Sequence, residues 1–174
     1  MELHIAIGLI EKGVEQNSSP QVWADLGAGN GLFTKALSTL LSKGSIIHAI
    51  DKDGKTLKSI DLHNKDMKLN TLELDFTRKT IPLESLDGII MANALHYVAD
   101  RMAFVKMLKS MLKPSGRFVI IEYDRTTSNQ WVPYPVSYKL LQHFAQEAGF
   151  SSVIKLGSQA SVYSEALIYS AILK

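Results

Sequence analysis

A run of seven residues with three alternating glycines, Asp25 to Gly31, is the segment of this sequence that most directly indicates a ligand site. Glycine has no Cβ, so it permits positive φ angles and lets a ligand approach the backbone closely. The run begins within a short, mostly apolar segment, residues 22–26, and precedes a helical stripe of apolar residues that extends from Leu32 to Leu41. We therefore expect a glycine loop at a strand-to-helix junction.

Two common glycine-loop signatures do not fit this run. The dinucleotide pattern G-x-G-x-x-G requires glycine or alanine where the chain has Leu32, because the third glycine, Gly31, comes one residue early. The phosphate-loop pattern requires Gly-Lys-Ser or Gly-Lys-Thr, which the loop lacks. Asp25 at the loop would also repel a pyrophosphate group. These observations argue against nicotinamide dinucleotides and nucleoside triphosphates as ligands.

Polar or flexible residues follow almost every apolar segment that is predicted to be a strand. These residues are Gly27, Asp51, Asp75, Asn93 and Glu122. Strands that alternate with helices predict βαβ units and a mostly parallel sheet, in which ligands bind beyond the carboxyl ends of the strands. We therefore expect these residues to gather along one edge of the sheet, where a crevice forms.

The predicted elements that position this edge follow from apolar periodicity. Strands are expected at residues 22–26, 45–50, 69–74, 86–92, 118–121, 152–156 and 166–173. Helices are expected within the N-terminal segment 1–19, after the glycine loop, at 53–63, from the cap Asp100 to the stop at 113–116, and at 136–148. The last two strands are expected to form a hairpin. Asp87, an acid near the start of an apolar strand, is expected to be structural.

Composition excludes several chemistries. The chain has 174 residues, 19 Lys and Arg against 17 Asp and Glu, five histidines and no cysteine. Without cysteine there is no thiolate nucleophile, cysteine zinc site or redox dithiol, and no two histidines have a metal-binding spacing, so we expect no metal. The balanced charge does not indicate nucleic acid, and no apolar run approaches the ~20 residues of a membrane span. The N-terminus lacks signal-peptide features, so we expect a cytoplasmic protein.

Asp25 to Gly31 resembles motif I, D/E-x-G-x-G-x-G, of the class I S-adenosylmethionine-dependent methyltransferases. Asp51, the Asp75-Phe76 pair and the segment from Leu86 through Asn93 to Tyr97 resemble the later motifs of that family in order and spacing. The similarity covers roughly residues 20 to 125. Within the family, the chain is most similar to the small methyltransferase type 11 proteins that are grouped with the ubiquinone and menaquinone biosynthesis methyltransferases.

The alternation and the resemblance together predict an α/β fold. It is Rossmann-like and doubly wound, with a mostly parallel seven-stranded sheet and an antiparallel C-terminal hairpin, in one domain over residues 1–174. The resemblance implies S-adenosylmethionine as cofactor and S-adenosylhomocysteine as product. It assigns cofactor binding to Asp25, Gly27, Gly29, Gly31, Asp51, Lys52, Asp75, Phe76 and Asn93.

The same resemblance implies a role for each polar position. Asp51 accepts from both ribose hydroxyls, and Lys52 lies along the ribose or adenine edge. Asp75 accepts from the adenine amino group, while the backbone amide of Phe76 donates to the ring. Asn93 meets the methionine ammonium group through its carbonyl or its side chain. Asp25 either accepts from that ammonium group or orients the glycine loop.

The loop after the fourth predicted strand places His96 where cofactor and acceptor meet in this fold, so His96 acts as a general base or lines the pocket. Tyr97 and Tyr123 are expected in the substrate pocket. Trp131 and Tyr134 form either an aromatic substrate wall or a packed loop.

The implied reaction is an in-line displacement that transfers the methyl group to a small-molecule acceptor. Proximity and alignment supply most of the rate, so a base is not obligatory. The segment from Asn93 to His96 departs from the N/D-P-P-Y/F motif of nucleic-acid amino methylation, so no nucleic-acid acceptor is expected. Two alternatives are a non-catalytic S-adenosylmethionine-binding partner or regulator and an NAD-dependent oxidoreductase. So short a chain has either an open pocket or a lid from a second subunit, which makes a homodimer one expectation.

Overall fold

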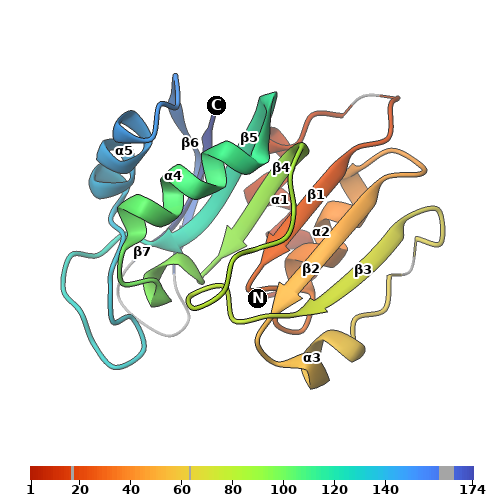
Figure 1. Ribbon diagram of the computed structural model, residues 1–174, viewed down its shortest axis with the longest axis horizontal. Helices are drawn as coiled ribbons and strands as arrows, with labels where there is room; N and C mark the ends of the chain where they lie inside the picture. The colour runs from red at the N-terminus through yellow and green to blue at the C-terminus, as the bar shows by residue number, and fades with distance from the viewer. Residues whose placement is uncertain (17, 63, 161–166) are drawn as a thin grey trace.

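The computed structural model describes residues 1–16, 18–62, 64–160 and 167–174. Its centre is a seven-stranded sheet with strand order β3-β2-β1-β4-β5-β7-β6 (Figure 1). The strands are β1 Val22–Leu26, β2 Ile46–Asp51, β3 Lys68–Glu73, β4 Leu86–Ala92, β5 Leu112–Tyr123, β6 Val153–Ala160 and β7 Leu167–Leu173. The helices are α1 Leu3–Ile10, α2 Leu32–Leu40, α3 Gly54–Lys58, α4 Arg101–Met111 and α5 Tyr138–Glu147, with short 3-10 turns η1 Glu11–Gly13 and η2 Leu95–Tyr97.

Strand direction divides the sheet into two parts. β1 pairs in parallel with β2 and β4, β2 pairs in parallel with β3, and β4 pairs in parallel with β5. β7 runs antiparallel to both β5 and β6. The predicted mostly parallel, doubly wound sheet with an antiparallel C-terminal hairpin is confirmed. The four parallel pairs bring the carboxyl ends of β1 to β5 to one edge.

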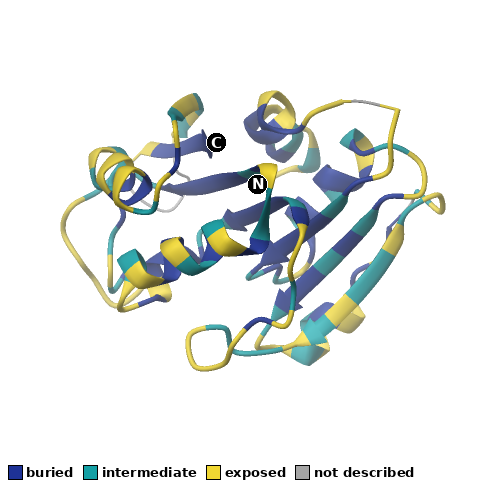
Figure 2. Cartoon of the chain, turned by 45° about the horizontal axis from the view of Figure 1, so that its top comes forward, coloured by how far each residue is buried: buried dark blue, intermediate teal, exposed yellow. Residues whose placement is uncertain are grey.

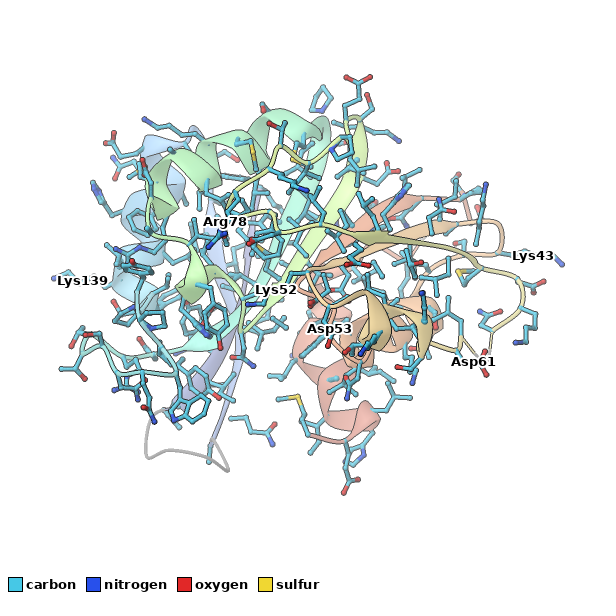
Figure 3. All side chains as sticks on the ribbon, turned by 60° about the horizontal axis from the view of Figure 1, so that its bottom comes forward. Lys43, Lys52, Asp53, Asp61, Arg78 and Lys139 are labelled. Carbon is cyan, nitrogen blue, oxygen red and sulfur yellow. The ribbon has the colours of Figure 1, made fainter. Side chains whose placement is uncertain are left out.

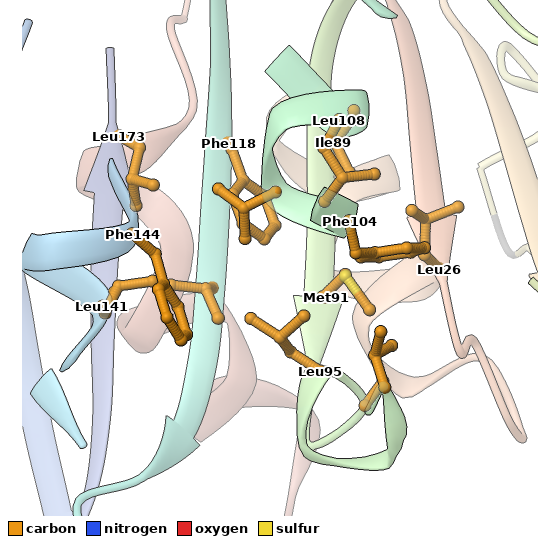
Figure 4. Packing of buried hydrophobic residues seen from close by; sticks show 14 of the residues in the cluster. Leu26, Ile89, Met91, Leu95, Phe104, Leu108, Phe118, Leu141, Phe144 and Leu173 are labelled. Atoms are coloured by element: carbon orange, nitrogen blue, oxygen red, sulfur yellow. The ribbon is translucent and has the colours of Figure 1, made fainter. Parts of the chain in front are cut away.

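Helices cover both faces of the sheet. Figure 1 shows α4 and α5 in front of the strands and α1 and α2 behind them. On β4, Ile89 and Met91 pack in the cluster that contains Phe104 of α4 (Figure 4). Ile90 packs in the cluster on the other face of the sheet. The central strands are accordingly buried along much of their length (Figure 2). Burial on both faces explains why β4 is a continuous apolar run rather than an alternating one.

Three elements have an end more than two residues from the predicted one. The strand expected at 152–156 is β6, which extends to Ala160. The helix expected at 53–63 is only α3, because Ile60 leaves the helical path and packs with Leu57 beneath the glycine loop; position 63 lies outside the described residues. β5 begins directly after α4, so residues 113–116, expected to be a helix stop, are part of the strand. Leu112 pairs there with Leu86, which extends the sheet.

Asp87 has the structural role expected for it. Its carboxylate accepts from the Val22 backbone N–H at 2.8 Å and from Lys113 Nζ at 2.7 Å. It therefore ties the start of β1 to β5 at the edge opposite the strand ends that form the crevice. Across the described part of the chain, every helix is too short or too polar to cross a bilayer.

Candidate functional site

The glycine loop joins β1 to α2 in a backbone conformation that requires glycine. Gly27, Gly29 and Gly31 have φ angles of 80°, 52° and 79°. A Cβ on Gly27 would lie 2.6 Å from the Cβ of Ala94, which precedes η2. A side chain at Gly27 would therefore push the loop away from the segment after β4. Close contact between these two loops is part of how the site is built.

Asp51, at the end of β2, holds the middle of the glycine loop. Its Oδ2 accepts from the Gly29 backbone N–H at 2.9 Å, and its Oδ1 accepts from the Asp53 N–H at 2.9 Å. Each carboxylate oxygen has a second acceptor site left. Because Asp51 also lines the cavity described below, these sites are available to hydroxyl or amine donors of a ligand.

Asp25 lies behind the loop rather than in a cavity. Its side chain is buried, and its Oδ2 accepts from Thr34 Oγ1 of α2 at 2.6 Å. Burial raises the pKa of Asp25 to about 7, the Thr34 hydroxyl lowers it in part, and the charge of Asp51 raises it further. The contact with α2 favours the role in which Asp25 orients the loop over direct contact with a ligand.

Beside the glycine loop lies the first cavity, of about 430 Å³, which we call the loop cavity. Its lining residues are Gly27, Asp51, Lys52, Leu74, Asp75, Phe76, Thr77, Arg78, Asn93, Ala94 and Tyr97. Figure 3 shows Lys52 and Arg78 near the middle of the edge where the strands end. Asp75 Oδ1 accepts from the Thr77 backbone N–H at 3.0 Å and from its hydroxyl at 2.6 Å, and the hydroxyl contact lowers the pKa of Asp75. The lowered pKa keeps the Asp75 carboxylate of the loop cavity ionised near neutral pH.

The second cavity, of about 420 Å³, adjoins the first, and we call it the histidine cavity. Its lining residues are Asn93, His96, Tyr97, Tyr123, Arg125, Asn129, Trp131 and Val132. It is largely aromatic, and the His96 and Tyr97 rings lie 4.3 Å apart between centroids. Asn93 and Tyr97 line both cavities, so a ligand in one cavity lies against a ligand in the other.

His96, which lines the histidine cavity, forms a buried pair with Glu122 behind it. His96 Nδ1 lies 2.8 Å from Glu122 Oε2, and the His96 backbone N–H donates to Oε1 at 3.2 Å. The Tyr123 N–H also donates to Oε2 at 3.3 Å. With the Nδ1 proton donated to Glu122, the neutral ring keeps Nε2 as an acceptor.

Asn93 has two unusual features at the junction of the cavities. It is a non-glycine residue with a φ of 52°, and its backbone N–H donates to the Ile121 carbonyl at 2.8 Å. Its Oδ1 is buried and has no hydrogen-bond partner among the described residues. A strained backbone with an unsatisfied acceptor is typical of a position that is completed by a ligand.

The structure brings most of the predicted site residues together. Six predicted cofactor residues line the loop cavity: Gly27, Asp51, Lys52, Asp75, Phe76 and Asn93. Gly29 and Gly31 belong to the glycine loop itself, and Asp25 lies behind it. Of the predicted substrate residues, Tyr97, Tyr123 and Trp131 line the histidine cavity, as does His96.

Tyr134 does not line the histidine cavity and corresponds to the packed-loop alternative. Its ring lies 5.6 Å from the Arg101 guanidinium, and its backbone N–H donates to the His96 carbonyl at 3.0 Å. Tyr134 therefore supports the turn that carries His96 instead of forming a substrate wall.

Several lining residues were not identified from the sequence. These are Leu74, Thr77, Arg78, Ala94, Arg125, Asn129 and Val132. The sequence placed Glu122 at the same edge as His96 and left open whether it acts in the site or only lines the pocket, but it did not indicate that the two side chains pair. Arg125 and Asn129 lie in a segment without periodicity, so the sequence pattern contained no signal for them.

The structure combines an α/β sheet that has a glycine loop after its first strand with two cavities that meet beyond the strand ends. This combination is typical of ligand-binding α/β domains. A family model described as "Methyltransferase domain" matches residues 24–120. The chain belongs to this methyltransferase domain family.

Curated relatives agree with this assignment over part of their length. A ubiquinone biosynthesis O-methyltransferase of Parvibaculum lavamentivorans is 29% identical over 104 residues, which cover 59% of this chain and 40% of the relative. That of Histophilus somni is 29% identical over 129 residues, covering 70% of this chain and 49% of the relative. The chain thus spans less than half the length of these relatives.

Solved structures show the same fold. The YcgJ protein of Bacillus subtilis has a TM-score of 0.69 at 13% identity, with 98% of this chain and 96% of that chain covered. A SAM-dependent methyltransferase of Leishmania major has a TM-score of 0.73 at 18% identity, with 98% of this chain and 71% of that chain covered.

Proposed function

We propose that this protein is an S-adenosylmethionine-dependent methyltransferase that acts on a small-molecule acceptor. The observation that carries the proposal is the meeting of two different cavities at Asn93 and Tyr97. One cavity has charged groups and a glycine loop, as a nucleoside with an amino acid tail requires. The other is aromatic and contains a histidine. Methyl transfer needs such an arrangement, because it joins two ligands at one point.

The residues of the loop cavity fit S-adenosylmethionine. Asp51 would hold the ribose hydroxyls with its remaining acceptor sites, while Lys52 would lie along the ribose or adenine edge. Asp75 would accept from the adenine amino group, and the Phe76 backbone amide would donate to the ring. The wall made by these side chains has both the acceptors and the apolar surface that the nucleoside needs.

The methionine end fits the glycine loop and Asn93. Gly27 gives the ligand access to the loop backbone, and the buried Asn93 Oδ1 would gain its missing partner from the ammonium group. When bound, S-adenosylmethionine supplies an electrophilic sulfonium methyl group that undergoes in-line displacement and leaves S-adenosylhomocysteine.

We propose His96 as the general base for acceptors that must lose a proton. Glu122 fixes the imidazole by accepting from Nδ1 and from the His96 backbone, so that Nε2 can accept the proton of an acceptor hydroxyl. Glu122 is therefore a positioning residue. Both side chains are buried, which excludes water from the pair and strengthens their interaction.

The two alternative functions differ from methyl transfer either in the ligand that is bound or in whether a reaction is catalysed. An NAD-dependent oxidoreductase conflicts with the loop spacing, because Gly31 comes one residue before the third glycine of the dinucleotide pattern. A non-catalytic partner or regulator would use the same cofactor residues but has no need of the His96–Glu122 pair. Cytoplasmic location, a homodimer and one domain over residues 1–174 stay predictions.

The test is transfer of a labelled methyl group from S-adenosylmethionine to a panel of hydroxylated, amino and thiol acceptors. We expect label in at least one hydroxylated acceptor, and His96→Gln should reduce that transfer. His143→Gln is the matched control, because His143 is exposed on α5 and lines neither of the two cavities. Cofactor binding without transfer to any acceptor would support the non-catalytic alternative instead.

A further inference from the structure

His96 is held at both of its peptide groups as well as at its ring. Glu122 Oε1 accepts from the His96 backbone N–H at 3.2 Å, and Glu122 Oε2 lies 2.8 Å from Nδ1. On the other side, the His96 carbonyl accepts from the Tyr134 backbone N–H at 3.0 Å. The position of the imidazole therefore depends on two separate parts of the chain, the end of β5 and the irregular segment 124–136.

The second of these supports comes from the run Pro133-Tyr134-Pro135, which we call the proline segment. Proline has no backbone N–H and a fixed φ, so Tyr134 has the only backbone donor of the three residues and stands between two stiff neighbours. That single N–H is the one that binds the His96 carbonyl. A shift of the proline segment therefore either breaks this hydrogen bond or moves the turn that carries His96.

Arg101, the first residue of α4, fixes the proline segment. Its Nη1 donates to the Pro135 carbonyl at 2.9 Å, and its guanidinium carbon lies 5.6 Å from the centroid of the Tyr134 ring. The same carbon lies 5.8 Å from the centroid of the Phe144 ring on α5. A planar guanidinium can stack on aromatic rings and donate hydrogen bonds at the same time. Arg101 thereby joins α4 and α5 to the segment that contacts His96.

The burial of Arg101 carries a cost that an apolar residue would avoid. Its Nε is buried and has no hydrogen-bond partner among the described residues, and an unsatisfied buried donor is destabilising. An apolar side chain of similar length would pack against the Tyr134 and Phe144 rings without that cost. Such a side chain would lack the donor that holds the Pro135 carbonyl. The contact that favours arginine here is therefore the one that fixes the proline segment.

We propose that Arg101 positions the general base. By fixing the proline segment, it keeps His96 in the orientation in which Nδ1 donates to Glu122 and Nε2 faces the histidine cavity. The inference rests on the proposed role of His96 and adds a residue on which its geometry depends. Arg101 is not among the described lining residues of either cavity, so it acts through Tyr134 and not by contact with a ligand. A misplacement of about 1 Å is enough to lower a rate by about 10²-fold.

The first measurement is the tautomer of His96, read by NMR from the ring nitrogens of the full chain with isotope-labelled histidine. It is made at about pH 8, where an imidazole is ordinarily neutral, and His96→Gln assigns the signal. We expect the wild type to show the Nδ1–H tautomer. Arg101→Gln should add the Nε2–H tautomer and speed exchange of the Nδ1 proton with solvent, because the ring is no longer held against Glu122. Arg101→Lys should retain part of the wild-type signal, since lysine keeps a donor but loses the planar group that stacks on Tyr134.

Lys106→Gln is the matched control. Lys106 lies on the same helix, its substitution also removes one positive charge, and its side chain is exposed and lines neither cavity. The His96 signal of this variant should match wild type, and urea unfolding checks that each variant is folded. If Arg101→Gln does not fold, the same comparison is made with Arg101→Lys. An unchanged His96 tautomer, or an equal change in Lys106→Gln, overturns the proposal.

The second measurement shows whether Arg101 acts through His96. Single-turnover transfer to the hydroxylated acceptor that is methylated best in the panel is measured for Arg101→Gln, His96→Gln and the double variant. Arg101→Gln should lower the rate by about 10- to 100-fold, while S-adenosylhomocysteine affinity stays within about twofold. Adding Arg101→Gln to His96→Gln should cause no further loss, because the base on which Arg101 acts is gone. Additive losses would assign Arg101 a different role and overturn the proposal.

The outcomes separate this inference from the proposed function. If no acceptor of the panel is methylated and S-adenosylhomocysteine does not bind, the proposed function fails, while the tautomer measurement still decides whether Arg101 positions His96. If methylation occurs but the His96 tautomer is the same in wild type and Arg101→Gln, the proposed function stands and this inference is wrong.

Discussion

The loop cavity and the histidine cavity lie side by side but are built in different ways. In the loop cavity, Asp51 and Asp75 already accept hydrogen bonds from the backbone around them. In the histidine cavity, Arg125 Nε is buried without a partner among the described residues, and Asn93 Oδ1 is likewise unpaired at the junction of the two cavities. The fold therefore holds the strand-end carboxylates of the cofactor side in place before a ligand binds, whereas unpaired groups lie at the junction and on the acceptor side.

The elements behind the two cavities explain this difference. The loop cavity is formed by the ends of β1, β2 and β3, whose parallel registers fix the lining residues relative to one another. The histidine cavity is formed by η2, the end of β5 and the irregular segment 124–136. Loops of this kind vary more readily than strand ends. We therefore expect substitutions in the first cavity to change cofactor binding and folding, and those in the second to change turnover and acceptor choice.

The largest expected effect is on the rate of methyl transfer and comes from a residue that lines only the histidine cavity. His96→Gln should lower the rate of methyl transfer to a hydroxylated acceptor by about 10²- to 10⁴-fold, the range for a lost general base. S-adenosylhomocysteine affinity should stay within about twofold, because His96 lines only the histidine cavity. Single-turnover kinetics and calorimetry measure the two quantities. Unchanged turnover would show that His96 only lines the pocket.

Asp25→Asn should change the pH dependence of folding. Because the folded pKa, about 7, is above the usual 3.8, the folded protein binds a proton that the unfolded chain has released. Asp25 therefore lowers the free energy of unfolding as pH rises from about 4 to 7, by an amount on the order of 4 kcal/mol, with little further change above that range. Asparagine removes this loss, so the variant should gain stability relative to wild type as pH rises.

Urea unfolding of both proteins across this pH range measures the difference. The Asp25→Asn protein should bind S-adenosylhomocysteine nearly as tightly as wild type, because Asp25 lies behind the loop. A large loss of affinity in the folded variant would instead assign Asp25 a direct contact with the ligand.

Substituting the glycines of the loop tests how firmly the cofactor side is organised. Gly27→Ala should lower the free energy of unfolding by about 3 kcal/mol and weaken cofactor binding, since it combines a positive φ with a Cβ 2.6 Å from Ala94. Gly29→Ala is the matched control, because its Cβ would meet no heavy atom within 4 Å, and it should cost about 1 kcal/mol from backbone strain alone. Equal losses in denaturant unfolding would contradict the close contact between the loops.

The smallest expected effect concerns one carboxylate of the loop cavity. Asp51→Ala should weaken S-adenosylhomocysteine binding by about 1.5 to 3 kcal/mol, because the ribose loses a charged acceptor and Gly29 loses its partner. Asp53→Ala, which removes the α3 cap but does not line the cavity, should change affinity by much less. Calorimetry on both variants measures this, and equal affinities for Asp51→Ala and wild type would refute the placement of Asp51 at the ribose.

The sequence predicted the residues of the loop cavity better than those of the histidine cavity. The apolar runs and the glycine spacing predicted the parallel strands, and therefore the edge where Asp51, Asp75 and Asn93 gather. The His96–Glu122 pair joins η2 to β5 across 26 residues, and no periodicity indicates such a contact. Tyr134 does not line the cavity, and its ring lies 5.6 Å from the guanidinium of Arg101, a contact between distant parts of the sequence that no local pattern indicates. The irregular acceptor side was the part that local patterns could not predict.

The most direct test of the account is calorimetric titration of the purified protein with S-adenosylmethionine and S-adenosylhomocysteine, with NAD and NADH titrated in parallel. We expect S-adenosylmethionine and S-adenosylhomocysteine to bind with dissociation constants on the order of micromolar, and neither dinucleotide to bind at comparable concentrations. If NAD or NADH binds and neither S-adenosylmethionine nor S-adenosylhomocysteine does, then the glycine loop, Asp51 and Asp75 do not form an S-adenosylmethionine site.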